Sequence, residues 1–283
     1  MIRFDGRVAV VTGAGRGLGA AYARELAARG AAVVVHDAGV DRRGEGQDPS
    51  VADAVVAEIR AAGGTAIASY ENLESEAACV RVVERAVAEF GRLDALVNNA
   101  GLVVYEDIDE AARSWERLRR VNVDAPFHLS RAAFSIMRRQ GHGRLIFTTS
   151  GIAMSAQDTR PGLAAYAAGK MAQFGLMVVF EAEGAPHGVR ANAISPVAAT
   201  RIYTQRAEPG ELEPEQVAPA VVFLASEECR VGGVVLAAAG GYFGTRRWAR
   251  ADGVDLGREP VTPETIAERW SEIDRWPAPT LRA

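Results

Sequence analysis

A glycine-rich turn connects a strand-like segment to a helical segment near the start of the chain. The apolar, β-branched run Val8–Thr12 precedes it, and Leu18–Arg29, whose apolar residues recur with helical spacing, follows it. Gly13, Gly17 and Gly19 allow a tight turn in which backbone N–H groups and the positive end of the helix dipole face one point. Such a turn suits a pyrophosphate, and the alternative is a turn that binds nothing. Because the spacing GxxxGxG differs from GxGxxG, the flanking strand and helix carry this interpretation.

The rest of the chain continues the alternation of strand-like and helical segments. Further strands are expected at Ala32–His36, Thr65–Tyr70, Ala95–Asn98, Arg144–Thr149, Arg190–Ser195 and Val234–Ala238. Further helices are expected at Val51–Ala61, Glu76–Phe90, Glu110–Arg139, Ala164–Glu183 and Glu215–Ala225. This alternation, with apolar strands, predicts an α/β fold in which helices cover both faces of a parallel sheet of about seven strands.

The C-terminal segment departs from this pattern. Thr245–Asp255 is basic and contains a tryptophan, and Thr262 and Pro263 have the types expected for the N-cap and first turn of a helix leading to Ile266–Trp276. We therefore expect one α/β domain over residues 1–244. Residues 245–283 would form a helical appendage, packed on that domain or on a neighbouring subunit.

Composition argues against several classes of function. Hydrophobic residues make up 48% of the 283 residues and charged residues 24%, which is typical of a globular protein with a sizeable core. The net charge of −4 argues against nucleic-acid binding. No apolar run approaches the ~20 residues of a membrane span, and no signal peptide opens the chain. The two cysteines and four histidines lack metal-ligand spacing. We therefore expect a cytoplasmic protein with free thiols, no metal site and no membrane partner.

An acidic residue ends the second strand-like segment. Asp37 stands eighteen residues after Gly19, where a carboxylate can accept hydrogen bonds from both hydroxyls of an adenosine ribose and repel a 2′-phosphate. This position favours NAD over NADP. Arg16 in the turn favours the opposite choice, because an arginine there can bind a phosphate.

Tyr166 and Lys170 lie four residues apart in a helical segment, so their side chains share one face. Of the 32 basic residues, Lys170 alone is lysine. This indicates a site that needs a compact ammonium, although genome composition also explains an arginine bias. A free phenol titrates near pH ~10, and a neighbouring ammonium, helped by an oxidised nicotinamide, is expected to lower its pKa. Tyr166 can then act as acid or base on an alcohol or carbonyl, with the Ser150 hydroxyl holding the substrate oxygen.

Together these residues resemble the short-chain dehydrogenase/reductase family. The similarity covers about residues 5–240, and the motifs occur in family order: Thr12–Gly19, Asn98–Gly101, Asn122, Ser150 and the pair Tyr166 and Lys170. The resemblance implies a doubly wound Rossmann fold and a nicotinamide cofactor. It also implies that Asn122, Ser150, Tyr166 and Lys170 form the catalytic set.

The same resemblance assigns roles to individual residues. Lys170 would bind the nicotinamide ribose, and Asn122 would anchor a water in a proton relay. Asn98 and Ala100 would line the cofactor cleft, and Thr12 and Asn98 would also connect the central strands. The full set expected to contact the cofactor is Gly13, Arg16, Gly17, Leu18, Gly19, Asp37, Asn98, Ala100, Gly101, Tyr166, Lys170 and Pro196. Since family members are usually dimers or tetramers, a homodimer or homotetramer is expected.

A narrower resemblance concerns Val35–Asp37, Val217–Pro219, Arg247–Arg250 and Thr262–Glu264. These segments are similar to the (3R)-hydroxyacyl-CoA dehydrogenase unit of the peroxisomal D-bifunctional protein and its bacterial relatives. The resemblance implies an NAD-linked oxidoreductase that acts on a small-molecule secondary alcohol or ketone, either a 3-hydroxyacyl-CoA ester or a hydroxysteroid. The alternatives are an enzyme of a specialised biosynthetic pathway with a different substrate, and a catalytically silent nucleotide-binding protein.

The substrate side departs from the family pattern. Sixteen residues separate Ser150 from Tyr166, a longer gap than is usual, and the loop 151–163 between them lacks the family's glycine-rich sequence. Asp158 and Arg160 in this loop either recognise a polar substrate or pair with each other at the surface. These differences affect the expected substrate more than the expected chemistry, because substrate choice resides in such loops.

Overall fold

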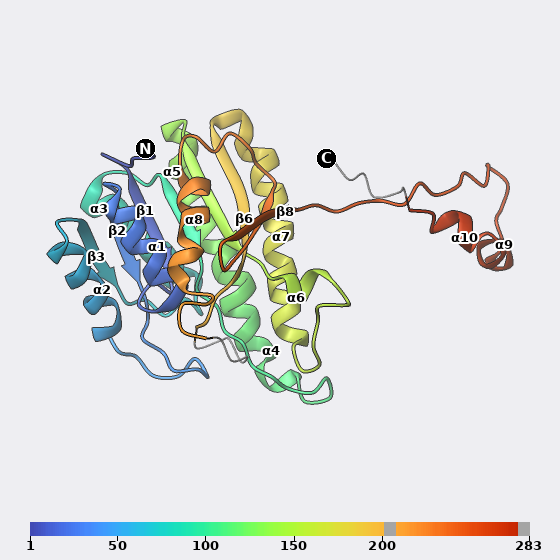
Figure 1. Ribbon diagram of the computed structural model, residues 1–283, viewed down its shortest axis with the longest axis horizontal. Helices are drawn as coiled ribbons and strands as arrows, with labels where there is room; N and C mark the ends of the chain where they lie inside the picture. Colours follow the sequence, from blue (N-terminus) through green and yellow to red (C-terminus); the bar gives the residue numbers. More distant parts are fainter. Residues whose placement is uncertain (201–207, 277–283) are drawn as a thin grey trace. The chain divides into compact units, whose positions relative to one another are not determined.

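The computed structural model describes residues 1–200 and 208–276. In this part of the chain, eight strands form one sheet in the order β3-β2-β1-β4-β5-β6-β7-β8 (Figure 1). All neighbouring strands are parallel except β8, which runs antiparallel to β7. Their bounds are β1 Val8–Thr12, β2 Ala32–His36, β3 Thr65–Ser69, β4 Ala95–Asn98, β5 Gly143–Thr148, β6 Val189–Val197, β7 Val235–Ala239 and β8 Tyr242–Arg246. The strand order changes direction between β1 and β4, which creates a crevice at their carboxyl ends.

The sheet confirms the expected fold class. Each of the seven expected strands is present, with bounds that differ by at most two residues. The sequence pattern does not anticipate β8, because four of its five residues are exposed. An edge strand of this kind buries no regular set of side chains, so it leaves no alternation of apolar and polar residues to detect.

Helices cover both faces of the sheet, which makes the fold doubly wound (Figure 1). Ala9 and Val11 of β1 face one core, and their neighbours Val8 and Val10 face the other, because successive side chains of a strand alternate. The first core packs against helices α1 (Gly17–Ala28), α2 (Ser50–Ala61) and α8 (Ala218–Ala225). The second packs against α3 (Glu76–Phe90), α5 (Ala125–Gln140) and α7 (Ala164–Gly184).

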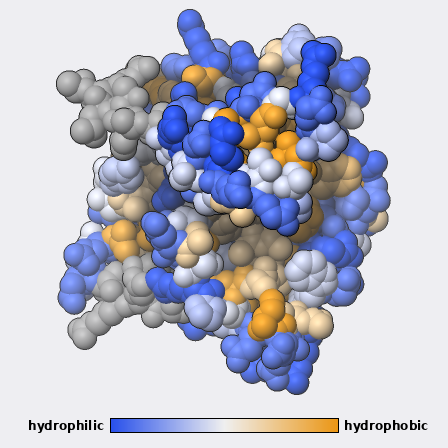
Figure 2. Space-filling view, turned by 90° about the vertical axis from the view of Figure 1, so that its right-hand side faces the viewer, coloured by the Kyte–Doolittle hydropathy of each residue, from blue (hydrophilic) through white to orange (hydrophobic). Residues whose placement is uncertain are grey.

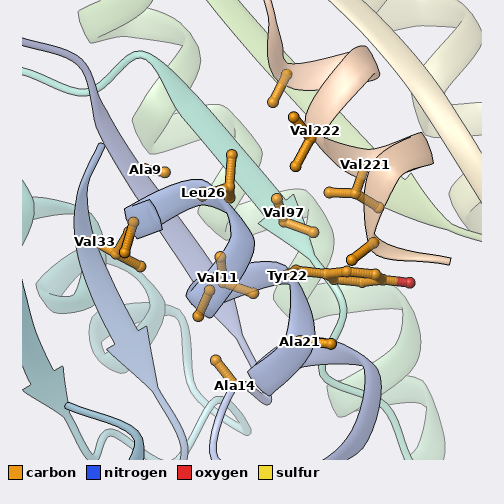
Figure 3. Close-up of a cluster of buried hydrophobic side chains, with 14 of the residues drawn as sticks. Ala9, Val11, Ala14, Ala21, Tyr22, Leu26, Val33, Val97, Val221 and Val222 are labelled. Atoms are coloured by element: carbon orange, nitrogen blue, oxygen red, sulfur yellow. The ribbon is translucent and has the colours of Figure 1, made fainter. Parts of the chain in front are cut away.

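Figure 3 shows the first core in detail. Tyr22 and Leu26 of α1 lie between the strand side chains and the valines Val221 and Val222 of α8. Burying a valine or leucine side chain contributes roughly 1.5–3 kcal/mol, so this cluster holds α1, and with it the glycine turn, firmly against β1.

The long helix expected at Glu110–Arg139 is interrupted. The structure has α4 (Ala112–Arg119), a π-helical turn η1 (Arg120–Asp124) and then α5. Pro126 stands in the first turn of α5 and has no N–H to donate to the carbonyl of Asn122, four residues earlier. That carbonyl instead accepts a hydrogen bond from Gln173 Nε2 at 3.1 Å. The turn therefore places Asn122 in the interior, where an uninterrupted helix would direct it differently.

Contacts within the chain separate a first compact unit, Met1–Arg246, from a second, Arg247–Ala283. The boundary lies two residues beyond the expected one, because β8 extends to Arg246. In the second unit, Thr262 Oγ1 accepts a hydrogen bond from Thr265 N at 3.2 Å and so caps α9 (Pro263–Glu268). A short helix α10 (Trp270–Ile273) follows.

The surface is largely polar where it can be seen. Hydrophilic side chains predominate on the face in Figure 2, and hydrophobic ones form small separate groups. Across residues 1–200 and 208–276, every helix is too short or too polar to cross a membrane.

Candidate active site

The glycine turn after β1 leaves no room for a side chain at Gly13 or at Gly19. A Cβ on Gly13, whose φ is +63°, would lie 2.9 Å from the Cα of Ala100, and a Cβ on Gly19 would lie 2.2 Å from the carbonyl oxygen of Gly13. Helix α1 begins at Gly17, and the side chain of its N-cap residue, Arg16, makes no capping hydrogen bond. The first N–H groups of α1 are therefore open to an anion, as a pyrophosphate site requires.

The carboxylate of Asp37 lies against this turn. Its Oδ2 accepts a hydrogen bond from Gly15 N at 2.9 Å, and its Oδ1 accepts one from Gly39 N at 2.8 Å. A Cβ on Gly15 would lie 2.9 Å from Asp37 Oδ2, so the close approach depends on glycine. Each carboxylate oxygen retains a lone pair for a ribose hydroxyl, and the negative charge opposes a 2′-phosphate.

A pocket lies at the crevice between β1 and β4. Its wall includes the expected residues Gly13, Arg16, Gly17, Leu18, Gly19, Asp37, Ala100 and Gly101. It also includes residues that sequence reasoning missed, among them Val40, Gly44, Glu74, Asn99 and Leu102. These residues lie in loops after β2, β3 and β4. The only sequence feature that could have predicted them is that parallel strands end at the same edge of the sheet, which brings the loops after these strands together. Tyr166, Lys170 and Pro196 are not among the wall residues, so their contact with a cofactor stays a prediction.

Asn98 is not among the residues of the pocket wall, so its contact with a cofactor stays a prediction. Asn98 is buried at the end of β4, where its Nδ2 donates to Ser130 Oγ at 3.0 Å. Asn99 lines the pocket instead, and its Nδ2 donates to Thr12 O at 2.9 Å. Thr12 Oγ1 accepts hydrogen bonds from Asn99 N and Ala100 N, which joins β1 to the end of β4. Side chains of neighbouring residues in extended chain face opposite sides, so the adjacent Asn99, directly after β4, was the other candidate for the pocket wall in the sequence.

Asn122 is buried in η1 and is held by the backbone of Leu102. Its Oδ1 accepts a hydrogen bond from Leu102 N at 3.0 Å, and its Nδ2 donates to Leu102 O at 2.9 Å. A Cβ on Gly169 would lie 2.6 Å from Asn122 Cβ, so this glycine allows α7 to approach η1 closely. A Cβ on Gly101 would lie 3.2 Å from Asn122 Oδ1 and 3.3 Å from Lys170 Nζ. Asn122 Oδ1 and Lys170 Nζ therefore both lie close to Gly101, a residue of the pocket wall.

Tyr166 and Lys170 share one face of α7, as their spacing predicts, and Lys170 Nζ lies 5.7 Å from the centroid of the Tyr166 ring. Lys170 is buried, which lowers the pKa of its ammonium to about 8. Burial also raises the pKa of the Tyr166 phenol, and a hydrogen bond with Ser150 offsets part of this rise. In the protein without cofactor, the pKa of Tyr166 is therefore raised and not lowered as expected, because the loss of hydration outweighs the hydrogen bond with Ser150.

In the loop after β5, Asp158 pairs with Arg246 and not with Arg160. Asp158 Oδ2 lies 3.8 Å from Nη1 of Arg246 in β8, and both side chains are exposed. Among the ion pairs of the described residues, none joins Asp158 to Arg160. The guanidinium of Arg246 also lies close to the position that a Cβ on Gly151 would take, with Nη2 3.1 Å away.

Comparison with known proteins places this site in a family. The family model for short chain dehydrogenases matches residues 7–209. The chain is 38% identical to peroxisomal multifunctional enzyme type 2 of Mus musculus over 279 residues, which cover 96% of this chain and 37% of that protein. It therefore spans little more than a third of that relative.

Solved structures agree with this result. A short chain dehydrogenase from Mycobacterium avium superposes with a TM-score of 0.84 and 35% identity, covering 99% of both chains. A 7α-hydroxysteroid dehydrogenase complexed with NADH and 7-oxo glycochenodeoxycholic acid superposes with a TM-score of 0.75 and 30% identity, covering 84% of this chain and 95% of that one. The family expected from the sequence is confirmed, and this chain belongs to the short-chain dehydrogenases/reductases, which use nicotinamide cofactors.

Proposed function

We propose that this chain is an NAD-dependent oxidoreductase that interconverts a secondary alcohol and a ketone, with Tyr166 as the acid/base. The observation that carries the proposal is a group of three side chains near the pocket wall. Asn122 Oδ1 and Lys170 Nζ both lie close to Gly101, a residue of that wall, and Lys170 Nζ lies 5.7 Å from the centroid of the Tyr166 ring. A protein that only binds a nucleotide has no need for this arrangement.

The pocket residues fit a dinucleotide. The uncapped amino end of α1 and the glycine turn would hold the pyrophosphate, and Asp37 would hold the adenosine ribose. Lys170 would hold the nicotinamide ribose. The bound nicotinamide supplies a hydride donor or acceptor and, when oxidised, a positive charge. The preference for NAD over NADP is supported by the Asp37 carboxylate, which Gly15 N and Gly39 N hold where the adenosine ribose would lie.

The protonation state of Tyr166 determines whether its phenol can give a proton to the substrate oxygen or take one from it. The ordinary pKa of a phenol lies near 10 and burial raises that of Tyr166 further, so in the protein alone the phenol is protonated at neutral pH and can give a proton to a carbonyl oxygen during reduction. In the oxidative direction the phenol must first lose that proton, and the rate is expected to rise with pH. The Ser150 hydroxyl, which contacts the phenol, would orient the same substrate oxygen.

The substrate is proposed to be a 3-hydroxyacyl-CoA ester or a hydroxysteroid. The similarity to the mouse multifunctional enzyme and to the 7α-hydroxysteroid dehydrogenase supports these two classes. A second candidate is a different oxygenated substrate from a specialised biosynthetic pathway. The long Ser150-to-Tyr166 loop and the nearby Arg246 favour this candidate, because they alter the substrate side and leave the catalytic residues in place.

A substrate panel tests the proposal. Reduced-nicotinamide absorbance would be followed with NAD and 3-hydroxyacyl-CoA esters, hydroxysteroids or small secondary alcohols, in the wild type and in Tyr166→Phe. We expect turnover with one of the first two classes and its loss in the variant. Turnover that survives in Tyr166→Phe would refute the acid/base assignment. Cofactor binding without turnover of any class would support the silent nucleotide-binding alternative.

We also propose that the protein forms a homodimer or homotetramer. Phe127 of α5 and Val178 and Val179 of α7 are exposed apolar side chains, which an interface would cover. Their replacement by serine should shift the mass measured by light scattering toward the monomer.

A further inference from the structure

The loop between β2 and α2 crosses the crevice that contains the pocket. In the sheet, β2 and β4 lie on opposite sides of β1. Gly44, in the loop after β2, nevertheless reaches Leu102, which follows β4: a Cβ on Gly44 would lie 2.7 Å from Leu102 Cδ1. Both residues belong to the pocket wall. Residues 39–48, here called the strap, therefore pass over the carboxyl end of β1, where the glycine turn begins.

The strap has internal order. Asp41 Oδ1 accepts hydrogen bonds from Arg43 N at 2.7 Å and from Glu45 N at 2.9 Å. Asp41 N in turn donates to Glu45 O at 2.9 Å. At the base, Asp48 N donates to Ala38 O at 3.2 Å. These bonds make the strap a folded loop with its own hydrogen-bonded structure.

Arg117 of α4 joins the tip of the strap to the opposite side of the crevice. Its Nη1 donates to Arg43 O at 3.1 Å and lies 3.5 Å from Glu45 Oε1. Its Nε lies 3.5 Å from Oε1 of Glu74, a wall residue from the loop after β3. In Figure 1 the blue loop after β2 extends from the strand ends in the direction of α4. Arg117 thus connects three segments that surround the pocket.

We propose that Arg117 is a positioning residue that holds the strap closed over a bound dinucleotide, and that cofactor exchange requires these contacts to open. The inference rests on the proposed function, since it takes the ligand of the pocket to be a dinucleotide. Arg117 is not itself part of the pocket wall, so it acts through the strap. Its ion pairs are partly exposed and individually weak, which allows opening within a catalytic cycle.

The test compares two arginines of the same helix. Arg117→Met removes the contacts to the strap, whereas Arg113→Met removes only an exposed pair with Glu110 at 3.1 Å. NADH would be bound to each protein, and its dissociation would be followed by stopped-flow fluorescence after displacement by excess NAD. We expect dissociation to be about tenfold faster in Arg117→Met, the effect of losing one backbone hydrogen bond and weak ion pairs, and unchanged in Arg113→Met.

Further measurements separate a specific role of Arg117 in holding the strap from a general loss of structure. The single-turnover hydride-transfer rate at saturating NADH should equal that of the wild type in Arg117→Met, because Tyr166 and Lys170 are untouched. Gly44→Ala should also accelerate dissociation, because its methyl group would lie 2.7 Å from Leu102 Cδ1 and 3.3 Å from Arg117 Cδ at a residue whose φ is +82°, and so strains the same contact from the other side. If NADH dissociates at the wild-type rate from both Arg117→Met and Gly44→Ala, the strap proposal is overturned and the proposed function stands. A wild-type protein that binds neither NADH nor NADPH would overturn the proposed function, and the strap inference with it.

Discussion

The ammonium nitrogen of Lys170 lies 2.9 Å from the carbonyl oxygen of Thr148, inside a domain where only 3% of the lysine is exposed. One hydrogen bond to a neutral carbonyl compensates only part of the hydration that the ammonium loses, and its pKa falls to about 8. The single lysine of the chain is thus held at a cost to stability, which is typical of functional sites.

This burial predicts how stability depends on pH. Between the folded pKa of about 8 and the unfolded value near 10.4, the unfolded chain binds more protons at residue 170 than the folded one. The free energy of unfolding of the wild type should therefore rise, relative to Lys170→Met, by up to about 3 kcal/mol as pH increases through this window. Urea unfolding of both proteins without cofactor at pH 7, 8.5 and 10 measures this difference in the free energy of unfolding. A difference that does not change with pH would contradict the burial argument.

Removal of the Tyr166 hydroxyl should affect chemistry and leave binding intact. In Tyr166→Phe we expect kcat/KM to fall by about two to four orders of magnitude, because general acid–base catalysis is lost. The affinity for NADH should change by no more than a few fold, since the glycine turn and Asp37 are untouched. Steady-state kinetics and fluorescence titration separate the two quantities. An equal loss in both would indicate that Tyr166 acts through binding.

Asp37 should control the choice between NAD and NADP. Asp37→Ala removes the two acceptors held by Gly15 N and Gly39 N, and with them the charge that repels a 2′-phosphate. We expect the ratio of kcat/KM for NAD to that for NADP to fall by about ten- to a hundredfold, a change of 1.4 to 2.8 kcal/mol in relative transition-state binding. Asp53→Ala, an exposed acid of α2 outside the pocket wall, is the control and should leave the ratio unchanged.

Two buried hydroxyls should respond in opposite ways to removal. The Tyr22 hydroxyl is fully buried in the core of Figure 3 and has no hydrogen-bond partner among the described residues. Tyr22→Phe should therefore leave the free energy of unfolding unchanged or raise it by about 1 kcal/mol. Thr12→Val removes an equally buried hydroxyl that has three partners and should cost about 1–3 kcal/mol. A large loss of stability in Tyr22→Phe would reveal a partner for that hydroxyl.

The sequence alone determined the features that depend on local periodicity. The apolar runs located all seven parallel strands, since a strand buried on both faces needs continuous apolar residues. The turn at Gly13–Gly19 and the acid at Asp37 were recognisable because the chemistry of a dinucleotide requires them at the ends of particular strands. The four-residue spacing of Tyr166 and Lys170 placed both on one helical face before any tertiary contact was known.

Tertiary structure decided the features that depend on which surfaces meet. Only the packing of η1 against α7 showed that Asn122 turns inward. Pro126 has no N–H to donate to the carbonyl of Asn122, and this carbonyl accepts a hydrogen bond from Gln173 of α7. Burial set the pKa of Tyr166 in the direction opposite to that expected from its neighbour Lys170. The strap reached Leu102 across the crevice without any periodic signal in its residues. Hydration and contact across distant segments are properties of the folded surface, and a sequence pattern, which records only near neighbours, does not contain them.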